Sequence, residues 1–370
     1  MHVGMIRKKH ILHCIPTMEG GGAERQLCYL CRGLVKRGWE IHVALMREGH
    51  NIRMLRESGA VVHPIRYWSH YDPLNILRIC SLIRAIKPSL VQTWLPMMDT
   101  IGGVACRLTG TPQIISERCS LEAHPGDLRD FLRIFVASSA RAVVSNSSQG
   151  DVYWRRKLKC SPPRFVIPNA LLLNEIREAV PVSLQKLDGH TNEKIVLFVG
   201  RFDKQKDLEN LVCALRRVTK SPKVAAFLVG DGPMRPAIER MIHNEGLSGR
   251  VFLPGYVANP WSWMKRADIF VSVSLFEGMP NTVMEAMACG CPAVVSDIPQ
   301  HREILDESEA TFVLPCDPDS IASGIDRLLG NPAEALQKAL CAKERASKWT
   351  ISAMTERYER VYLDILGHAK

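Results

Sequence analysis

Long hydrophobic runs are missing from this sequence of 370 residues. None of its apolar segments approaches the ~18 residues expected of a membrane-spanning helix. Basic residues precede an apolar run near the amino terminus, but that run extends only from Ile11 to Pro16, which is too short for the core of a secretory signal peptide. We interpret it as a first β-strand. The sequence therefore predicts neither a membrane span nor a leader, and we expect the protein to be cytoplasmic.

Several motifs of common active sites are also missing. The sequence has no Walker loop, no His-Glu-x-x-His zinc motif and no Gly-x-Ser-x-Gly nucleophile motif. Its Asp317-Pro318-Asp319 segment is interpreted as a turn and helix N-cap before Ile321 rather than as a metal site. The 12 cysteines are spread thinly and lack evident ligand partners, which favours reduced thiols. We therefore expect no essential metal ion and no cofactor.

Positive charge is concentrated in the first half of the chain. Residues 1–180 contain 25 Lys and Arg against 14 Asp and Glu, whereas the remainder contains 23 against 24. This asymmetry predicts an anionic partner for the first half, such as a membrane surface, a phosphorylated lipid carrier or nucleic acid. The densest cluster comprises Arg155, Arg156, Lys157 and Lys159 beside Trp154. We expect this cluster to dock on an anionic cytoplasmic membrane face, with Trp154 at the headgroup level.

Strand-like and helix-like segments alternate along the whole chain, which predicts parallel βαβ units and an α/β fold. The apolar content of 46% is sufficient for two cores of ordinary size. A polar segment at 186–192 is expected to link the two domains. Strands are expected at His10–Ile15, Ile41–Leu45, Val61–Ile65, Leu90–Thr93, Gln113–Ser116, Ala142–Ser145, Phe165–Ile167, Lys194–Val199, Val224–Val229, Val251–Leu253, Ile269–Val273, Ala293–Ser296 and Thr311–Leu314.

Two glutamates eight residues apart form the most informative motif. Glu277 follows the strand-like run Ile269 to Leu275, and Glu285 lies in the helix-like segment Asn281 to Ala288. Glu277 is therefore expected on a loop at the carboxyl end of a strand, the edge at which open α/β sheets bind ligands. The N-terminus of the following helix suits a phosphate. A pyrophosphate held there leaves one carboxylate for a sugar hydroxyl and the other for a ribose.

This spacing resembles the Glu-x7-Glu signature of the retaining GT-B glycosyltransferases of the group 1, or GT4, family. Companion motifs occur in the family's order: Gly20 to Glu24, Ile167 to Asn169, Gly200 to Lys206, Val229 to Pro233 and Phe252 to Tyr256. The resemblance implies two Rossmann-like domains that face each other across a cleft. Residues 1–175 would bind the acceptor, residues 190–350 the nucleotide-sugar, and a helix in 351–370 would pack back on the first domain.

The resemblance also implies roles for individual residues. Arg201, Lys206 and Glu277 would be catalytic, and the acceptor side would include Glu117, Arg118 and Asn146. The donor would be bound by Gly21, Gly22, Gly200, Gly232, Tyr256, Val257, Gly278, Met279, Pro280, Asn281, Thr282 and Glu285.

Two positions depart from the family pattern. No histidine follows the strand near Ile115, where the family commonly has one. Asp207 stands where the family often has glycine, and we interpret it as a helix N-cap.

The function implied is transfer of a hexose from a nucleotide-sugar to a saccharide or lipid-linked acceptor, with retention of anomeric configuration, in polysaccharide or glycolipid biosynthesis. UDP-sugars are favoured over GDP-sugars. Two alternatives stay open: a non-hydrolysing sugar-nucleotide epimerase of the same two-domain architecture, and a basic nucleic-acid-binding protein. The second is disfavoured because the basic residues are not interleaved with aromatic platforms.

Overall fold

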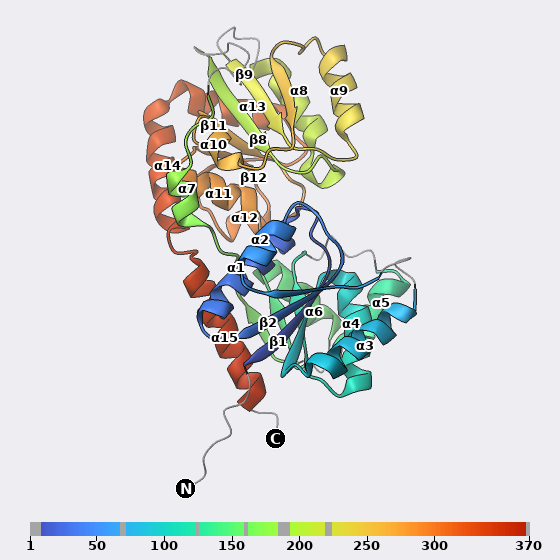
Figure 1. Ribbon diagram of the computed structural model, residues 1–370. Coiled ribbons are helices and arrows are strands. Elements are labelled where there is room, and N and C mark those ends of the chain that lie inside the picture. The colour runs from blue at the N-terminus through green and yellow to red at the C-terminus, as the bar shows by residue number, and fades with distance from the viewer. Residues whose placement is uncertain are drawn as a thin grey trace. The chain divides into compact units, whose positions relative to one another are not determined.

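The computed structural model describes residues 9–66, 72–120, 122, 126–158, 162–183, 193–218 and 224–367 (Figure 1). The expected linker at 186–192 and Lys159 lie outside the described residues. Contacts divide the chain into two compact units, one spanning 1–170 and 349–370 and the other spanning 171–348. Among the helices of the described residues, none has both the length and the hydrophobicity that crossing a bilayer requires.

The first unit contains a seven-stranded sheet of order β3-β2-β1-β4-β5-β6-β7, with every pair parallel. Its strands are β1 (His10–Thr17), β2 (Glu40–Arg47), β3 (Val61–Pro64), β4 (Leu90–Trp94), β5 (Gln113–Glu117), β6 (Ala142–Ser145) and β7 (Arg164–Val166). Its helices are α1 (Gly22–Lys36), α2 (Ile52–Glu57), α3 (Leu74–Ile86), α4 (Leu95–Thr109), α5 (Leu128–Ala137), α6 (Ser148–Lys157) and α15 (Ile351–Gly367).

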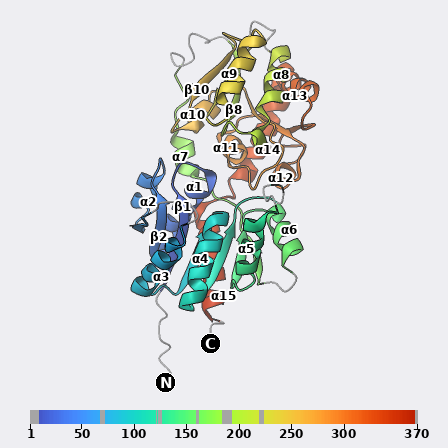
Figure 2. The ribbon, with the colours of Figure 1, turned by 90° about the vertical axis from the view of Figure 1, so that its right-hand side faces the viewer.

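The two faces of this sheet are covered by different helices. Leu12 and Ala44 project from one face into a cluster with Ile79 of α3 and Met98 of α4. Near the other face, α1 packs against α15, which lies behind α3 and α4 in the view of Figure 2. Gly33 of α1 permits this close approach, because a Cβ there would lie 2.0 Å from the Thr355 hydroxyl. The strand order reverses direction between β1 and β4, so the expected ligand-binding edge of this sheet lies at the carboxyl ends of these two strands.

The terminal helix α15 is fixed to the first unit by polar contacts as well as by packing. Glu359 accepts a hydrogen bond from Trp39 Nε1 at 2.8 Å and pairs with Arg37 at 3.0 Å and with Lys9 at 3.1 Å. The Tyr362 hydroxyl donates to the Gln92 side chain in the interior of the sheet. The last helix therefore completes the core of the unit that contains the start of the chain.

The second unit contains a six-stranded parallel sheet of order β10-β9-β8-β11-β12-β13. Its strands are β8 (Lys194–Val199), β9 (Val224–Val229), β10 (Val251–Gly255), β11 (Ile269–Ser272), β12 (Ala293–Ser296) and β13 (Thr311–Val313). Its helical elements are α7 (Leu173–Glu178), η3 (Lys204–Lys206), α8 (Leu208–Val218), α9 (Arg235–Asn244), α10 (Pro260–Met264), α11 (Asn281–Cys289), α12 (Pro299–Arg302), α13 (Pro318–Gly330) and α14 (Pro332–Ala346).

In this sheet the order reverses between β8 and β11, so the expected ligand edge lies at the carboxyl ends of these two strands. The segment from Gly200 follows β8, and the segment that contains Glu277 follows β11. The strand order of this unit therefore places the segment from Gly200 and the segment that contains Glu277 side by side at this edge of the sheet. The N-cap expected at Asp317 is confirmed, since its side chain accepts from the backbone N–H groups of Asp319 and Ser320.

Candidate active site

A buried ion pair lies between the ends of β8 and β11. Lys206 Nζ is 2.5 Å from Glu277 Oε1, and the Glu277 residue is only 6% exposed. Burial alone would raise the pKa of the Glu277 carboxyl, but the charge and hydrogen bond of Lys206 hold that pKa below its usual range. The carboxylate is therefore ionised at neutral pH and in position to accept further hydrogen bonds.

Neighbouring side chains fix the orientation of Glu277. Ser274 Oγ donates to Glu277 Oε1 at 2.7 Å, and Gln205 Nε2 donates to Glu277 Oε2 at 3.2 Å. The Gln205 side chain also donates to the Phe276 carbonyl at 2.7 Å, and the Gln205 backbone carbonyl accepts from the Leu275 N–H at 2.8 Å. The turn after β8 is therefore joined to the loop after β11 by three hydrogen bonds and one ion pair, and with the bond from Ser274 these leave the Glu277 carboxylate little freedom to rotate.

A histidine that the sequence interpretation missed lies behind this loop. His301 is fully buried, and its Nδ1 lies 2.8 Å from the Ser296 carbonyl oxygen, a contact that fits Nδ1–H as the donor. Ser296 Oγ in turn donates to the Ser274 carbonyl at 2.6 Å. Burial lowers the pKa of the His301 imidazole, and Glu277 and Lys206 both lie within electrostatic range of it. His301 thus supports the loop of Glu277 through Ser296 at the end of β12 and Ser274 in the loop after β11. A lone histidine carries no sequence signal for this role.

The helix α11 carries the second glutamate. Glu285 lies one turn inside this helix and is 3% exposed, between buried neighbours such as Met284 and Ala286. The first intrahelical bond runs from the Met284 N–H to the Pro280 carbonyl. The N–H groups of Thr282 and Val283 therefore precede the hydrogen-bonded part of the helix. Gly278, Met279, Pro280 and Asn281 form the approach to this helix start, as the motif predicts.

Arg201 takes a different position from Lys206. Its side chain is 72% exposed and its Nε lies 3.8 Å from Asp203 Oδ2, so no contact with Glu277 fixes it. Asp207 adopts a left-handed backbone conformation with φ of +52°, which explains why glycine suits this position in the family. Asp207 occupies the predicted N-cap position of α8, since its backbone carbonyl accepts from the Leu211 N–H at 3.2 Å, but its side chain is bonded elsewhere: Oδ1 accepts from the Asn210 side chain at 2.8 Å.

Two glycine segments pack tightly against each other beside the ion pair. A Cβ on Gly232 would lie 2.4 Å from the Phe202 carbonyl oxygen, and one on Gly200 would lie 2.8 Å from the Phe198 ring. The Phe202 N–H donates to the Asp231 carbonyl at 2.8 Å. These glycines therefore set the path of the backbone on both sides of Arg201.

Replacing Gly230 with alanine should destabilise the second unit by about 2–4 kcal/mol, because its φ is +141° and a Cβ would lie 1.9 Å from the Gly200 carbonyl oxygen. Thermal unfolding measures the effect. Gly330→Ala is the matched control, since a Cβ at the end of α13 meets nothing within 4 Å. Equal melting temperatures for the two variants would show that the close approach of the two loops does not require glycine at position 230.

The expected acceptor-side residues are committed to internal contacts. Glu117 ends β5 and is 1% exposed; its Oε2 pairs with Arg133 at 2.7 Å, and its Oε1 accepts from the Arg118 and Cys119 N–H groups at 2.9 Å. Burial alone would lower the pKa of the Arg133 guanidinium, but Glu117 and Asp99 raise it, so Arg133 stays charged. The expectation that Glu117 faces an acceptor is therefore corrected: it anchors α5 to the sheet.

Arg118 and Asn146 lie close together at the same edge of the sheet. The Arg118 guanidinium donates to Asn169 Oδ1 at 3.0 Å and stacks over the Trp94 ring at 4.7 Å. The Asn146 N–H donates to the Glu117 carbonyl at 3.1 Å. Arg118 therefore joins the ends of β4 and β5 to the segment after β7. These two contacts fix the position of its guanidinium.

The glycine loop of the first unit makes room for a buried carboxylate. Gly20 has φ of +118°, which only glycine adopts readily. A Cβ on Gly21 would lie 2.3 Å from Glu24 Oε2, and Glu24 Oε1 accepts from the Thr17 hydroxyl at 3.2 Å. Gly22 is the first residue of α1. The loop thus follows β1 directly, at the switch point of its sheet.

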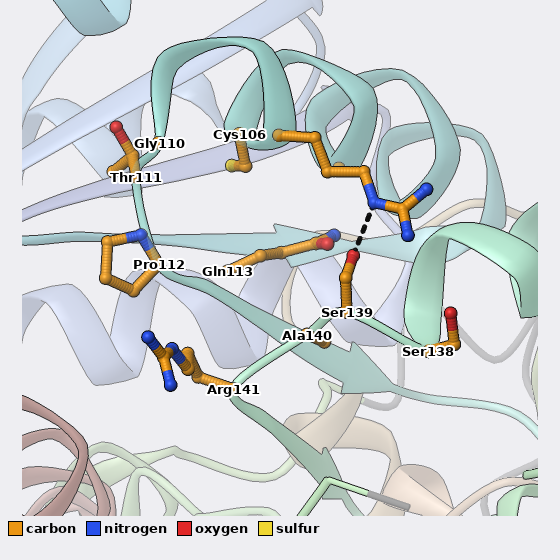
Figure 3. A pocket seen from close by; sticks show the side chains of 11 residues that line it. Cys106, Gly110, Thr111, Pro112, Gln113, Ser138, Ser139, Ala140 and Arg141 are labelled. Atoms are coloured by element: carbon orange, nitrogen blue, oxygen red, sulfur yellow. Dashed lines mark hydrogen bonds between the residues drawn. The ribbon is translucent and has the colours of Figure 1, made fainter. Parts of the chain in front are cut away.

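Two cavities lie elsewhere in the described residues. One of about 300 Å³ opens at the amino ends of β5 and β6, where Arg107 donates to the Ser139 hydroxyl at 2.7 Å (Figure 3). It is at the opposite edge of the sheet from Glu117. The other, of about 770 Å³ in the second unit, is lined by Val257 and Trp263 among others. Tyr256, beside Val257, is 55% exposed.

The membrane contact expected at Trp154 is contradicted by the structure. Trp154 is fully buried, and its ring lies beneath the Arg133 guanidinium at 4.7 Å. Arg155 pairs with Asp151 at 2.9 Å, and Lys157 lies 4.0 Å from Asp130. The tryptophan therefore belongs to the core, because it covers the buried arginine that holds α5, and it cannot reach lipid headgroups.

Comparisons with known proteins assign the chain to a family. Residues 20–173 match the model of glycosyltransferase family 4, and residues 182–349 match that of the glycosyl transferases group 1. The chain is 30% identical over 342 residues to an N-acetylgalactosaminyltransferase of Campylobacter jejuni that acts on a diphospho-undecaprenol-linked sugar, covering 88% of this chain and 91% of that protein. It is 25% identical over 347 residues to the lipopolysaccharide core biosynthesis glycosyltransferase LpsD of Rhizobium meliloti, covering 91% and 94%.

Solved structures agree on the fold. The crystal structure of Anabaena HepE in complex with UDP-glucose superimposes with a TM-score of 0.86 at 20% identity, covering 96% of this chain and 99% of that one. The chain therefore belongs to the group 1, or GT4, glycosyltransferases, and it is a glycosyltransferase of class EC 2.4 with the GT-B fold. Neither the epimerase nor the nucleic-acid-binding alternative is favoured by these comparisons.

Proposed function

We propose that this enzyme transfers a hexose from a UDP-sugar to a lipid-linked glycan, with retention of configuration at the anomeric carbon. The ionised, buried Glu277 carboxylate beside Lys206 carries the proposal. The names of two relatives support the acceptor class, since the Campylobacter jejuni enzyme and an Escherichia coli galactosyltransferase that is 22% identical over 314 residues each act on a sugar linked to diphospho-undecaprenol. The UDP-glucose complex of the structural neighbour supports the donor class.

The donor would bind at the carboxyl ends of β8 and β11. Glu277 would accept hydrogen bonds from hydroxyls of the sugar, and Glu285 from the ribose. The N–H groups at the start of α11 would meet the diphosphate, which suits the positive end of the helix dipole. Lys206 would balance the negative charge that grows on the departing diphosphate, and the exposed Arg201 would close on the same group when the donor is present.

In a retaining transfer the acceptor approaches on the face from which the diphosphate departs. In this proposal the reaction there needs no side chain of the protein as a general base. A diphosphate oxygen on that face can accept the proton of the acceptor hydroxyl while the sugar bond breaks. The pairing of Glu117 with Arg133 supports this view, because Glu117 is the carboxylate among the expected acceptor-side residues and it is already held by that ion pair. We also propose that the cations of the protein replace a metal at the diphosphate, so turnover should survive EDTA.

Nucleotide release that depends on the acceptor tests the proposed reaction. The enzyme is incubated with UDP-sugars and GDP-sugars, with and without a polyprenyl-diphosphate-linked glycan. We expect UDP release only when the acceptor is added, and NMR of the product should show the donor's anomeric configuration. Interconversion of the nucleotide-sugar without an acceptor would instead indicate an epimerase, and an inverted product would refute retention.

An apolar face on α5 supports contact with an anionic membrane. The polar and apolar faces of this helix are exchanged relative to an ordinary surface helix. Asp130 and Arg133 face the interior, whereas four large apolar side chains face outward. These four, which we call the α5 face, are Leu128, Phe131, Leu132 and Phe135, with exposed fractions from 44% to 72%. Arg107 stacks over Phe135 at 4.9 Å, and Arg129 is exposed on the same helix. Apolar residues flanked by cations suit the surface of an anionic bilayer.

Replacing Phe131 and Phe135 together with alanine should reduce binding to anionic liposomes roughly ten-fold or more, since both rings would leave the bilayer interface. Co-sedimentation measures the loss, and wild-type binding should fall as salt rises. The matched control is Leu336→Ala with Leu340→Ala, two leucines of α14 that are comparably exposed. Equal losses in the two double variants, or no binding by the wild type, would favour a soluble acceptor.

A further inference from the structure

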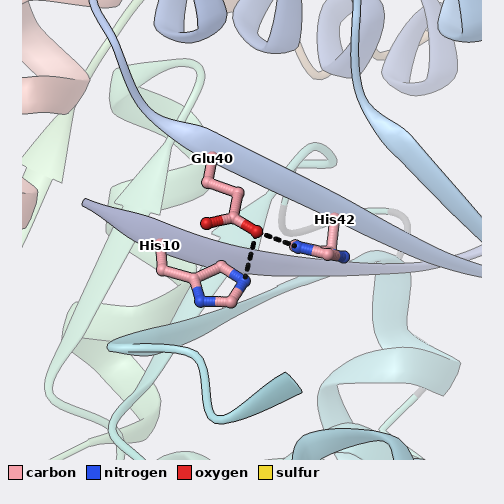
Figure 4. A group of neighbouring side chains, drawn as sticks. All are labelled: His10, Glu40 and His42. Atoms are coloured by element: carbon pink, nitrogen blue, oxygen red, sulfur yellow. Dashed lines mark hydrogen bonds and ion pairs between the residues drawn. The ribbon is translucent and has the colours of Figure 1, made fainter. Parts of the chain in front are cut away.

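Two histidines and a glutamate converge at the amino-terminal edge of the sheet in the first unit (Figure 4). His10 and Glu40 begin β1 and β2 and are partners in the register, and His42 lies two residues further along β2. All three side chains therefore project from the same face of the sheet. Glu40 Oε1 lies 3.8 Å from His10 Nε2 and 3.3 Å from His42 Nε2, and the three ligand atoms all lie within 4.8 Å of one another.

We propose that His10, Glu40 and His42 bind a Zn²⁺ ion. Two imidazoles and one carboxylate form a donor set that zinc accepts readily. Ligand atoms at the usual zinc distances lie about 3.3 Å apart in a tetrahedral site. The contact between Glu40 and His42 already has this length, and the contact between Glu40 and His10 is longer by only about 0.5 Å.

The exposure of the three ligands fits an ion that enters from solvent. The two imidazoles are nearly buried, with side chains 7% and 11% exposed, whereas the Glu40 side chain is 61% exposed. The imidazoles therefore form a fixed pair, and the carboxylate can turn to close on the ion. A water molecule would occupy the fourth position.

A third histidine holds the first pair in place. His63 of β3 lies on the same face of the sheet, and its Nε2 is 2.7 Å from His42 Nδ1. If His42 Nδ1–H donates to His63, then His42 Nε2 carries the lone pair that a metal needs. Metal-binding histidines commonly have such a partner on the second ring nitrogen.

The ion would not take part in glycosyl transfer. It would lie at the amino ends of β1 and β2, whereas the glycine loop follows the carboxyl end of β1. Because β1 has 8 residues, the two ends are roughly 25 Å apart. We therefore assign the ion a structural role that joins β1 to β2, independent of the proposed transfer reaction.

Metal binding is measured on the full chain without an affinity tag, after chelator treatment and dialysis. We expect one Zn²⁺ per chain and a melting temperature raised by roughly 5 °C at saturating zinc. Co²⁺ should give the visible absorption of a four-coordinate site. Glu40→Gln, which alters an exposed side chain and preserves the fold, should weaken binding at least ten-fold. His63→Gln should weaken it roughly ten- to 100-fold.

Two control variants separate this site from incidental binding. His243→Gln changes an exposed histidine of the other unit, and Cys316→Ser removes an exposed thiol. Both should leave the stoichiometry and the Co²⁺ spectrum unchanged. Binding that is lost in Cys316→Ser but kept in Glu40→Gln would overturn the proposal, as would no retained zinc at about 100 μM free metal.

Discussion

Replacing Lys206 with alanine is expected to lower kcat by roughly 100- to 1000-fold, the usual loss when one preorganised electrostatic contact to a transition state is removed. Lys206 is the cation fixed beside Glu277, at 2.5 Å, and the diphosphate gains negative charge only as the sugar bond breaks. The loss should therefore appear in kcat more than in KM. Steady-state kinetics with the donor varied at saturating acceptor measures both.

The neighbouring Lys204 provides a matched control. It lies in the same short turn η3 and is exposed, so Lys204→Ala should keep nearly full activity. The melting temperature of both variants must be recorded, because Lys206→Ala leaves the Glu277 carboxylate buried without its cation. Lys206→Arg should recover part of the activity if charge is what matters. An unchanged kcat in a folded Lys206→Ala enzyme, with only KM raised, would refute the transition-state role.

The second large effect is expected for Glu285→Gln, which should raise the KM for the nucleotide-sugar roughly ten- to 100-fold. A hydrogen bond between a hydroxyl and a buried carboxylate contributes about 1.5–3 kcal/mol, and glutamine keeps the shape but not the charge. The ribose is bound equally in the ground state and the transition state, so kcat should change little.

Titration with UDP alone separates this effect from the chemistry. The dissociation constant of UDP should rise by the same factor as KM in Glu285→Gln. Glu209→Gln, on the exposed first turn of α8, should leave both values unchanged. If the dissociation constant of UDP is the same in Glu285→Gln and the wild type, the ribose is bound elsewhere.

Most of the fold could be predicted from local sequence. The bounds of β8, β9, β12 and β6 coincide with the predicted apolar segments, because each is a short buried run that polar or turn-forming residues delimit. The place of Glu277 and Glu285 followed from the same reasoning, since a strand end and a helix start are both local features. The contacts of Glu277 were not predictable, because Gln205 and Lys206 lie 72 and 71 residues away along the chain.

The errors at Glu117 and Trp154 share one physical cause. Helix α5 hides Asp130 and Arg133 and exposes Phe131 and Phe135, the reverse of the usual amphipathic pattern. The buried Arg133 uses Glu117 as its counter-ion and lies over the Trp154 ring. The family resemblance had placed Glu117 on the acceptor side, and the neighbouring basic cluster had suggested a membrane contact for Trp154. Only the tertiary structure shows which charges are paired inside.

Hydrogen exchange measured by mass spectrometry, with and without saturating UDP, tests the proposed donor site most directly. The account predicts slower exchange in peptides that cover residues 200–206 and 277–285, because a nucleotide bound at the ends of β8 and β11 would engage the helix start and stabilise both loops. Peptides covering α5 and α3 should be unaffected. Protection confined to the first unit, with residues 277–285 exchanging at the same rate in both samples, would contradict the account.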